Sequence, residues 1–409
     1  MALYQSHVRL LFKQNRRTAR VMSKSPPALR YAAFYGTVFL ALGIYLPFWP
    51  VFLKSRGLSA AEIGLLFGLV SWVRVVSTPA VAQLADRSGR AQTILALAAC
   101  GSFVFFVGFF WARGFWPILL IMLPATACFQ VLIPLAESQT MAAVLRQRLD
   151  YGRIRLWGSL AFILGTVGAG QLITGRAPDL VLLLVLGALG TTVLAALALP
   201  GRRERPHGAE RTSPLALLGN RRFLLFLGAA SLLQASHAAY YGFSALHWKA
   251  AGLSEGTIGW LWAEGVLAEV LLFAMGGTLV ARAGPPVLLA LAGLAGILRW
   301  SVLAATTALP ALVAVQALHA LTFGAAHLGA MHFIARAAPP GLSATAQSFY
   351  SAVSGGIAMG LAMLAAGALY QAYAGQVFLV MAVLSAGGLA LALVLWRRQH
   401  RGGGETGPA

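Results

Sequence analysis

Twelve predominantly apolar runs of about 20 residues recur along the chain and are separated by short polar segments. A helix needs about 20 such residues to cross the hydrocarbon core of a bilayer. Glycine and alanine are frequent inside the runs, which suits close packing of helices in lipid. The pattern predicts an all-α membrane protein with twelve transmembrane helices at 31–53, 61–84, 92–111, 116–141, 156–174, 180–199, 223–247, 257–280, 286–307, 310–335, 343–370 and 377–396.

An internal repeat divides the spans into six and six. Lys54–Gly64 follows the first span, and Lys249–Gly259 follows the seventh at an offset of 195 residues. Carried on to Gly89 and Gly284, the alignment has 11 identities in 36 positions. Two parallel repeats predict two pseudo-symmetric six-helix bundles with a ligand site between them near the middle of the membrane.

The domain boundaries follow from this repeat. We predict an N-terminal bundle at 31–199 and a C-terminal bundle at 223–396, joined by a Pro- and Arg-rich linker at 200–222. Basic tails at 1–30 and 397–409 flank the two bundles.

The basic residues are distributed unequally between the two sides of the predicted bundle. Of the 31 lysines and arginines, 24 lie on the tails and on alternate connections, 5 lie on the opposite loops and 2 lie within spans. Because positive residues gather on the cytoplasmic side, we expect both termini in the cytoplasm and a multi-pass protein of the bacterial inner (plasma) membrane. The same asymmetry explains the net charge of +20 without a nucleic-acid partner.

One connection carries a recognisable motif. The segment Ala82–Arg90 (AQLADRSGR) resembles the G-x-L-A-D-R-x-G-R loop signature of the major facilitator superfamily, with Ala82 in place of the first glycine. The predicted gating residues are Asp86, Arg87, Gly89 and Arg90. Glycine permits a tight turn, aspartate accepts from a helix N-terminus or an arginine, and the arginines suit an anionic membrane face.

Ionisable residues inside the spans are the sharpest functional signal. A charge at the bilayer centre costs about 2.5–3.5 kcal/mol on insertion scales, so such residues face a cavity and pair with one another. This set comprises Arg74, Glu137, Arg155, His237, Glu264, Glu269, Arg299, His319, His327 and His332.

Glu269 and Arg74 occupy equivalent positions of the two repeats, which predicts that they lie on opposite walls of a central cavity. An apolar surrounding favours the protonated form of a carboxylate, and a nearby arginine favours the ionised form. A substrate that competes for the arginine therefore changes the protonation of the carboxylate. We predict Glu269, His319 and Arg299 as proton-coupling residues, with a static ion pair as the alternative.

Histidines and cysteines are further candidates for chemistry inside the spans. We expect His319 and His327 to look into the cavity as hydrogen-bonding or proton-relay groups, and His237 and His332 to be structural. No His/Cys/Asp spacing suits zinc, and Cys100 and Cys128 read as packing residues, so we expect no metal and no cofactor other than the proton gradient.

The first span contains an aromatic and proline-rich stretch, Tyr45–Pro50 (YLPFWP). Its prolines predict a bent helix. Tyr45, Phe48 and Trp49 are candidates to contact an aromatic ligand, with ordinary packing as the alternative.

Several short segments together resemble the phenylpropionate permease family, which is related to the lactose permease group of proton symporters. They are Gly43–Pro50, Tyr151–Gly158, Trp262–Glu269, Leu298–Trp300 and Leu318–Gly324. The resemblance extends from about residue 30 to residue 396. It implies a major facilitator fold and an aromatic or other small carboxylate as substrate.

The resemblance also implies roles for individual residues. In the lactose permease group a glutamate of the fourth span pairs with an arginine of the fifth at the ligand site, and Glu137 and Arg155 match them. Arg299 and His319 match residues that matter there for proton coupling. The acidic residue that follows the histidine is replaced by Thr322, and the lysine of span 11 is absent near Gly355, so Glu269 is expected to take over proton binding.

We therefore predict a monomeric secondary transporter that takes up a small organic acid together with protons by alternating access. The predicted substrate-binding residues are Tyr45, Arg74, Glu137, Arg155, Trp262, Arg299 and His327. A proton-coupled exporter of drugs or metabolites, and a sugar or nucleoside symporter of the same fold, remain alternatives. The chain contains no nucleotide loop and no G-x-S-x-G, so we do not expect an enzyme.

Overall fold

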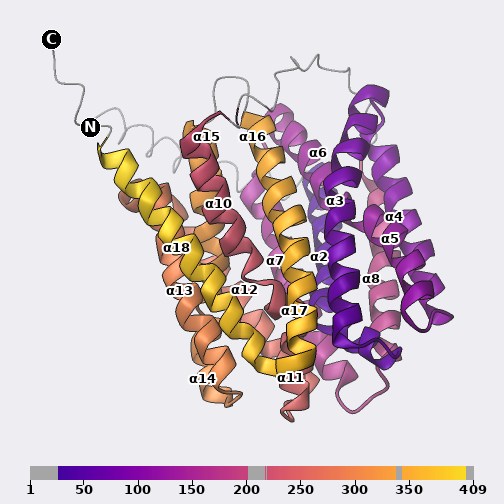
Figure 1. Cartoon of the computed structure of the whole chain (residues 1–409). Coiled ribbons are helices and arrows are strands. Elements are labelled where there is room, and N and C mark those ends of the chain that lie inside the picture. Colours follow the sequence, from indigo (N-terminus) through magenta and orange to yellow (C-terminus); the bar gives the residue numbers. More distant parts are fainter. Residues whose placement is uncertain (1–25, 201–216, 218, 338–342, 402–409) are drawn as a thin grey trace.

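The computed structural model describes residues 26–200, 217, 219–337 and 343–401, which are almost entirely helical and contain no strand (Figure 1). Most of the predicted linker and of the two tails lies outside these residues. The main helices are α2 (Pro26–Ser55), α3 (Ala60–Ser88), α4 (Ala91–Val107), α5 (Phe115–Gln130), α6 (Leu132–Gln147), α7 (Tyr151–Ile173), α8 (Asp179–Ala198), α10 (Arg221–Ala235), α11 (Ala238–Ala250), α12 (Glu255–Ala283), α13 (Pro285–Ala305), α14 (Leu309–Gln316), α15 (Ala326–Ala337), α16 (Ser343–Tyr350), α17 (Met359–Tyr373) and α18 (Val377–Arg401).

These helices form twelve membrane crossings. Among the described residues, 11 helical stretches are long and apolar enough to span a bilayer. The last stretch, Thr345–Gln399, has 55 residues. At 1.5 Å per residue it would be about 80 Å long, more than twice the roughly 30 Å hydrocarbon core. It reverses direction at Ala374, whose φ is 47°, so that α17 and α18 are two separate spans (Figure 1).

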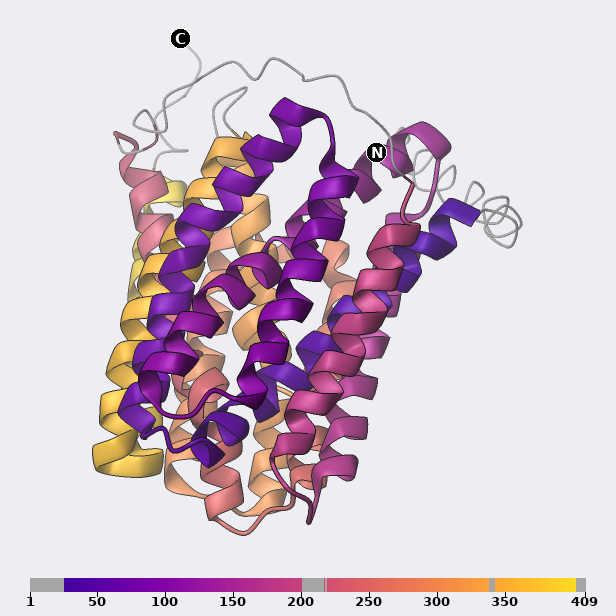
Figure 2. The same ribbon diagram turned by 90° about the vertical axis from the view of Figure 1, so that its right-hand side faces the viewer.

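The bundle has two ends, which we call the terminal face and the opposite face. The terminal face is the end where α2 begins and α18 ends, and it is uppermost in Figures 1 and 2. The opposite face carries the turns after α2, α7 and α11. Gly57, Gly175 and Gly252 adopt φ values of 94°, 70° and 89° in these turns, which favour glycine because a Cβ is disfavoured there.

Four of the spans are interrupted near the middle. The fourth divides into α5 and α6 at Val131, and the seventh divides into α10 and α11 at Ser236–His237. The tenth and eleventh contain π-helical segments, η2 (Ala320–Ala325) and η3 (Ser351–Ala358). The first span has no such interruption, because α2 continues through Pro47 and Pro50. Interruptions of this kind are common where membrane helices line a cavity.

The first six spans and the last six meet mainly along two helix pairs, α3 with α17 and α7 with α12, and α2 also packs on α11. Glycines allow the backbones to touch. A Cβ built on Gly64 would lie 2.6 Å from the Cα of Gly367, and one on Gly259 would lie 2.3 Å from the carbonyl oxygen of Thr166. Gly64 and Gly259 are equivalent positions of the repeat, so the two contacts are related by the pseudo-twofold symmetry.

Two hydrogen bonds join the same pairs, also symmetrically. The backbone N–H of Ala61, in the first turn of α3, donates to Gln371 Oε1 at 3.0 Å. The backbone N–H of Gly256, in the first turn of α12, donates to Thr174 Oγ1 at 2.9 Å. The free N–H groups of each helix start are thus partly satisfied by the other half of the molecule. These contacts close the bundle toward the opposite face.

Candidate functional site

A cavity of about 430 Å³ lies between the first and second sets of spans. Helices α2, α3, α5 and α6 contribute one wall, and α10, α11, η3 and α17 contribute the other. Its size falls in the range of small-molecule sites. The lining residues are Leu42, Tyr45, Leu46, Phe67, Val70, Ser71, Arg74, Thr126, Phe129, Gln130, Ile133, Pro134, Glu137, Gln234, Tyr241, Gly355, Met359 and Met363.

Arg74 is the cation of this cavity. It lies in the middle of α3, yet it is solvent-exposed, because it borders the cavity. No hydrogen bond, ion pair or ring contact holds its guanidinium among the described residues. Arg74 is therefore available to a negatively charged ligand.

The surroundings of Arg74 are mainly apolar and aromatic. Tyr45, Phe67, Phe129 and Tyr241 provide rings on the cavity wall. Tyr45 is nearly buried and stacks on Trp49, with ring centroids 5.3 Å apart. This combination of one charged group and several rings can hold a small molecule that has an acidic end and an apolar body.

Two amides, which the sequence did not single out, also line the cavity. The Oε1 atom of Gln130 is buried without a hydrogen-bond partner among the described residues, and Gln130 Nε2 donates to the carbonyl of Val70 at 3.4 Å. Gln234 lies on the facing wall, next to the break between α10 and α11. A buried polar atom without a partner is costly, so Gln130 is a candidate to accept a hydrogen bond from a ligand.

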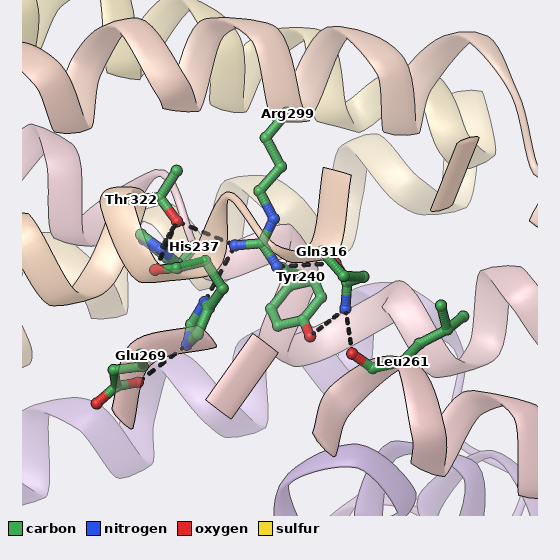
Figure 3. Close-up of polar contacts among 8 residues, drawn as sticks. His237, Tyr240, Leu261, Glu269, Arg299, Gln316 and Thr322 are labelled. Atoms are coloured by element: carbon green, nitrogen blue, oxygen red, sulfur yellow. Dashed lines mark hydrogen bonds and ion pairs between the residues drawn. The ribbon is translucent and has the colours of Figure 1, made fainter. Parts of the chain in front are cut away.

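A second polar cluster lies within the last six spans and is built around Arg299 (Figure 3). Its side chain is fully buried on α13. Nη1 lies 3.1 Å from His319 Nδ1 and donates to Thr322 Oγ1 at 3.0 Å, and Nη2 donates to Gln316 Oε1 at 2.8 Å. The guanidinium also lies 4.6 Å from the centre of the Tyr240 ring. These partners hold a buried cation that would otherwise be strongly unfavourable.

Glu269 is the outer member of this cluster. Its Oε2 lies 3.5 Å from His319 Nε2, and its side chain is 17% exposed. His319 thus connects a carboxylate that water can reach with an arginine that water cannot. Arg155 and His327 lie close enough to Glu269 to interact with it electrostatically. Because Arg155 belongs to α7, the surroundings of Glu269 include charges from both halves.

Side chains next to Arg299 fix the position of the cluster. Gln316 Nε2 donates to Tyr240 Oη and to the carbonyl of Leu261, both at 2.9 Å. His237 lies at the break of the seventh span, with Nε2 3.3 Å from Thr322 Oγ1. The sequence did not identify Gln316 or Tyr240 as partners of Arg299. The signal available was three polar side chains at the i, i+3 and i+6 positions 316, 319 and 322 of one span.

The structure separates the predicted substrate-binding residues into two groups. Tyr45, Arg74 and Glu137 line the cavity. Arg155, Trp262, Arg299 and His327 do not contribute to its wall. Trp262 is buried and stacks on Tyr240 with ring centroids 4.5 Å apart, and Arg299 is enclosed by its own cluster. Phe48 and Trp49 are likewise fully buried and serve packing instead of ligand contact.

Glu137 and Arg155 do not form the close ion pair that the resemblance to lactose permease implies. Tyr151 Oη donates to Glu137 Oε1 at 3.4 Å. The Arg155 guanidinium instead lies 4.0 Å above the Phe39 ring. The two charges still interact at longer range. Glu137 therefore reaches the cavity without a close ion pair to Arg155, which does not line it.

The three aromatic rings at 319, 323 and 327 form a stack. His319 and Phe323 have centroids 5.4 Å apart, and Phe323 and His327 have centroids 6.1 Å apart. The π-helical segment η2 lies between the histidines and changes their angular spacing from that of a regular helix. His319 is buried, whereas His327 is exposed.

The predicted gating motif lies at the terminal face. Gly89 ends α3 with φ 62° and ψ 21°, and its N–H donates to the carbonyl of Ala85 at 3.0 Å. This left-handed end is the tight turn that the motif predicts. Asp86, Arg87 and Arg90 are exposed beside it. Within the part of the chain that the structure describes, no three His, Cys, Asp or Glu side chains are placed to hold a metal ion.

Twelve membrane crossings in two related sets, with a cavity between them, define the chain as a membrane transporter of the major facilitator type. The family model described as "MFS_1 like family" matches residues 28–380, so the chain belongs to this family.

Individual relatives agree with this assignment. The chain is 37% identical to the "Probable 3-phenylpropionic acid transporter" of Escherichia coli K12 over 344 residues, which are 82% of this chain and 89% of the relative. It is 28% identical to the "Maltose permease" of Geobacillus stearothermophilus, over 83% of this chain and 86% of that one. The crystal structure of the nucleoside transporter NupG shares the fold, with a TM-score of 0.80 at 16% identity and coverage of 91% and 99% of the two chains. The chain is accordingly a multi-pass membrane transporter and not an enzyme.

Proposed function

We propose that this transporter takes up a small organic acid with an apolar, preferably aromatic, body by proton-coupled symport. The observation that carries the proposal is Arg74, an exposed cation without a partner among the described residues, in an aromatic-lined cavity between the two sets of spans. An arginine fork binds a carboxylate, and the rings of the wall suit an aromatic body. The similarity to a probable 3-phenylpropionic acid transporter supports this substrate class.

Alternating access supplies the mechanism. The symmetric α3–α17 and α7–α12 contacts close the bundle toward the opposite face, and we infer from this closure that substrate reaches the cavity from the terminal face. From the distribution of lysine and arginine, we assign the terminal face to the cytoplasm. This state then releases substrate to the cytoplasm, and rocking of the two halves reopens the cavity to the outside.

The proton step uses the cluster around Glu269. Glu269 lies on α12, outside the lining of the Arg74 cavity and at the edge of the Arg299 cluster. A charged substrate near Arg74 changes the electrostatic field at Glu269, which then binds or releases a proton. His319 and Arg299 position this carboxylate from behind, because His319 touches both. The gradient of protons is thereby the energy source, and no further cofactor is needed.

Uptake into proteoliposomes tests the proposal directly. With 3-phenylpropionate outside, an imposed inward proton gradient is expected to drive accumulation. Each pH unit is worth about 1.4 kcal/mol per proton, equivalent to roughly tenfold accumulation for one proton per substrate. Uptake that is the same with and without the gradient would exclude proton coupling. Faster efflux than uptake under matched gradients would favour the exporter alternative.

Replacement of Arg74 tests the carboxylate site. Arg74→Gln is expected to weaken binding of 3-phenylpropionate by about 10- to 100-fold, because a hydrogen bond to a charged group contributes about 1.5–3 kcal/mol. Isothermal titration or a thermal-shift series on the purified protein measures the change. Arg74→Lys keeps the charge and should retain part of the affinity. The neutral amide of the same acid provides the ligand control, since it should bind both proteins equally. An equal loss for acid and amide would show that Arg74 does not bind the carboxylate.

A further inference from the structure

A second cavity, of about 260 Å³, opens at the terminal face, away from the cavity that holds Arg74. It lies where α10 and α13 begin and where α15 and α18 end. The two cavities share no lining residue. The lining residues of the second are Asn220, Arg222, Pro285, Phe333, Arg336, Ala337, Leu395 and Gln399.

The rim of this cavity is basic and polar. Arg222 and Arg336 are exposed, lie on α10 and α15, and have no ion-pair partner among the described residues. Asn220 and Gln399 add amide groups, and no described lining residue is acidic. Asn220 Oδ1 already accepts from the backbone N–H groups of Arg222 and Phe223, at 3.0 and 3.2 Å. The start of α10 is therefore capped, and the two arginine side chains remain to bind an anion.

The floor of the cavity is apolar. Phe333 and Leu395 are buried there, and Phe333 stacks on Phe226 with ring centroids 4.2 Å apart. Next to Leu395 in the sequence, the same end of α18 also carries exposed apolar side chains, among them Leu393, Val394 and Trp396. These side chains suit contact with lipid tails and the membrane interface. The cavity thus combines a basic rim with an apolar floor, and the helix end that supplies Leu395 also carries exposed apolar side chains.

We propose that this cavity binds the phosphate-bearing headgroup of an anionic phospholipid. The phosphate lies between Arg222 and Arg336, the glycerol region rests on Phe333 and Leu395, and an acyl chain continues along α18. Basic cavities between transmembrane helices on the cytoplasmic side are suited to such headgroups. The topology rule alone accounts for arginines on this face, but it requires neither a concave site nor an apolar floor. A soluble phosphate ligand would use the two arginines and leave the floor without a function.

The experiment compares lipid retention by native mass spectrometry of the full chain in mixed micelles of phosphatidylglycerol and phosphatidylcholine. Wild type is expected to retain phosphatidylglycerol in preference to phosphatidylcholine and to gain thermal stability from it. Arg222→Gln/Arg336→Gln should lower this preference by roughly 10- to 30-fold, because the variant loses the charge interaction of each arginine with the lipid phosphate. Arg222→Lys/Arg336→Lys, which keeps both charges, should retain much of it and confirms that the fold tolerates changes here.

The matched control removes two exposed arginines of the terminal face elsewhere, with Arg30→Gln/Arg148→Gln. This variant should keep the wild-type preference. An equal loss in the control, or no preference in wild type, would reduce the effect to general surface charge and overturn the proposal. Inorganic phosphate is added in a separate arm with phosphatidylcholine alone. If it stabilises wild type as strongly as phosphatidylglycerol does, and not the double variant, the ligand is a soluble phosphate and the lipid proposal is wrong.

Discussion

Glu269→Gln is expected to abolish uphill uptake while leaving substrate exchange intact. Glutamine keeps the size and a hydrogen-bonding oxygen, so it can still contact His319, which lies 3.5 Å from the native carboxylate. It cannot bind and release a proton. Under an imposed gradient the accumulation ratio should fall to about 1, against roughly tenfold per pH unit for a working one-proton symporter. Exchange of labelled for unlabelled substrate across the same membrane should proceed at close to the wild-type rate.

Glu264→Gln provides the matched control for this experiment. Glu264 lies on α12 as well, five residues earlier, and has no hydrogen bond or ion pair among the described residues. The Glu264→Gln variant should retain uphill uptake. Normal accumulation by Glu269→Gln would show that another group carries the proton. Loss of exchange together with accumulation would mean that Glu269 is needed for the fold or for the conformational change, and proton coupling would have to be assigned differently.

The spans were predictable because hydropathy and length determine them. The first predicted span, 31–53, corresponds to α2 at Pro26–Ser55, and the second, 61–84, corresponds to α3 at Ala60–Ser88. The helices extend further than their apolar cores, because the polar residues at their ends continue the backbone hydrogen bonding into the interface. The capping box of Ser59 and Glu62 at the start of α3 is an example that hydropathy does not detect.

The site was predictable only in part. A charged residue in an apolar span reports that it faces a cavity or a partner, which identified Arg74, Glu269 and Arg299. The sequence does not show whether a given charged residue faces the cavity or a buried partner. Arg74 proved to border the open cavity, whereas Arg299 is enclosed by Gln316, His319 and Thr322.

The local geometry of the helices explains why the partners of these charged residues could not be predicted. Partner choice in the last six spans depends on the break at Ser236–His237 and on the π-helical segment η2, both of which shift side chains away from the positions of a regular helix. Neutral partners such as Gln130 and Gln316 carry no comparable sequence signal, since an amide inside a span is less costly than a charge. The repeat in the sequence relates Gly64 to Gly259, but it does not show that the two halves touch at these glycines.

Gly64→Val is expected to prevent closure toward the opposite face and to abolish transport. Even the Cβ of a side chain at this position would lie 2.6 Å from the Cα of Gly367 and 2.6 Å from the carbonyl oxygen of Met363, both backbone atoms that no rotamer change can move. Overpacking costs about 1–3 kcal/mol, which corresponds to a roughly 5- to 150-fold shift away from the closed arrangement. Gly259→Val meets the carbonyl of Thr166 at 2.3 Å and should behave alike, because the repeat places it at the equivalent contact.

Spin labels across the opposite face measure this shift. Labels at Arg176→Cys and Ala308→Cys, in a chain carrying Cys100→Ala and Cys128→Ala, report the separation of the two halves. Gly64→Val should move the distance distribution to longer values while substrate still binds, since Gly64 does not line the cavity. Gly36→Val is the control, because a Cβ at Gly36 meets nothing within 4 Å. Unchanged distances and normal transport in Gly64→Val would show that the halves do not need this contact to close. Transport requires both arrangements in turn, so a chain held open on one side binds its substrate and does not release it to the other.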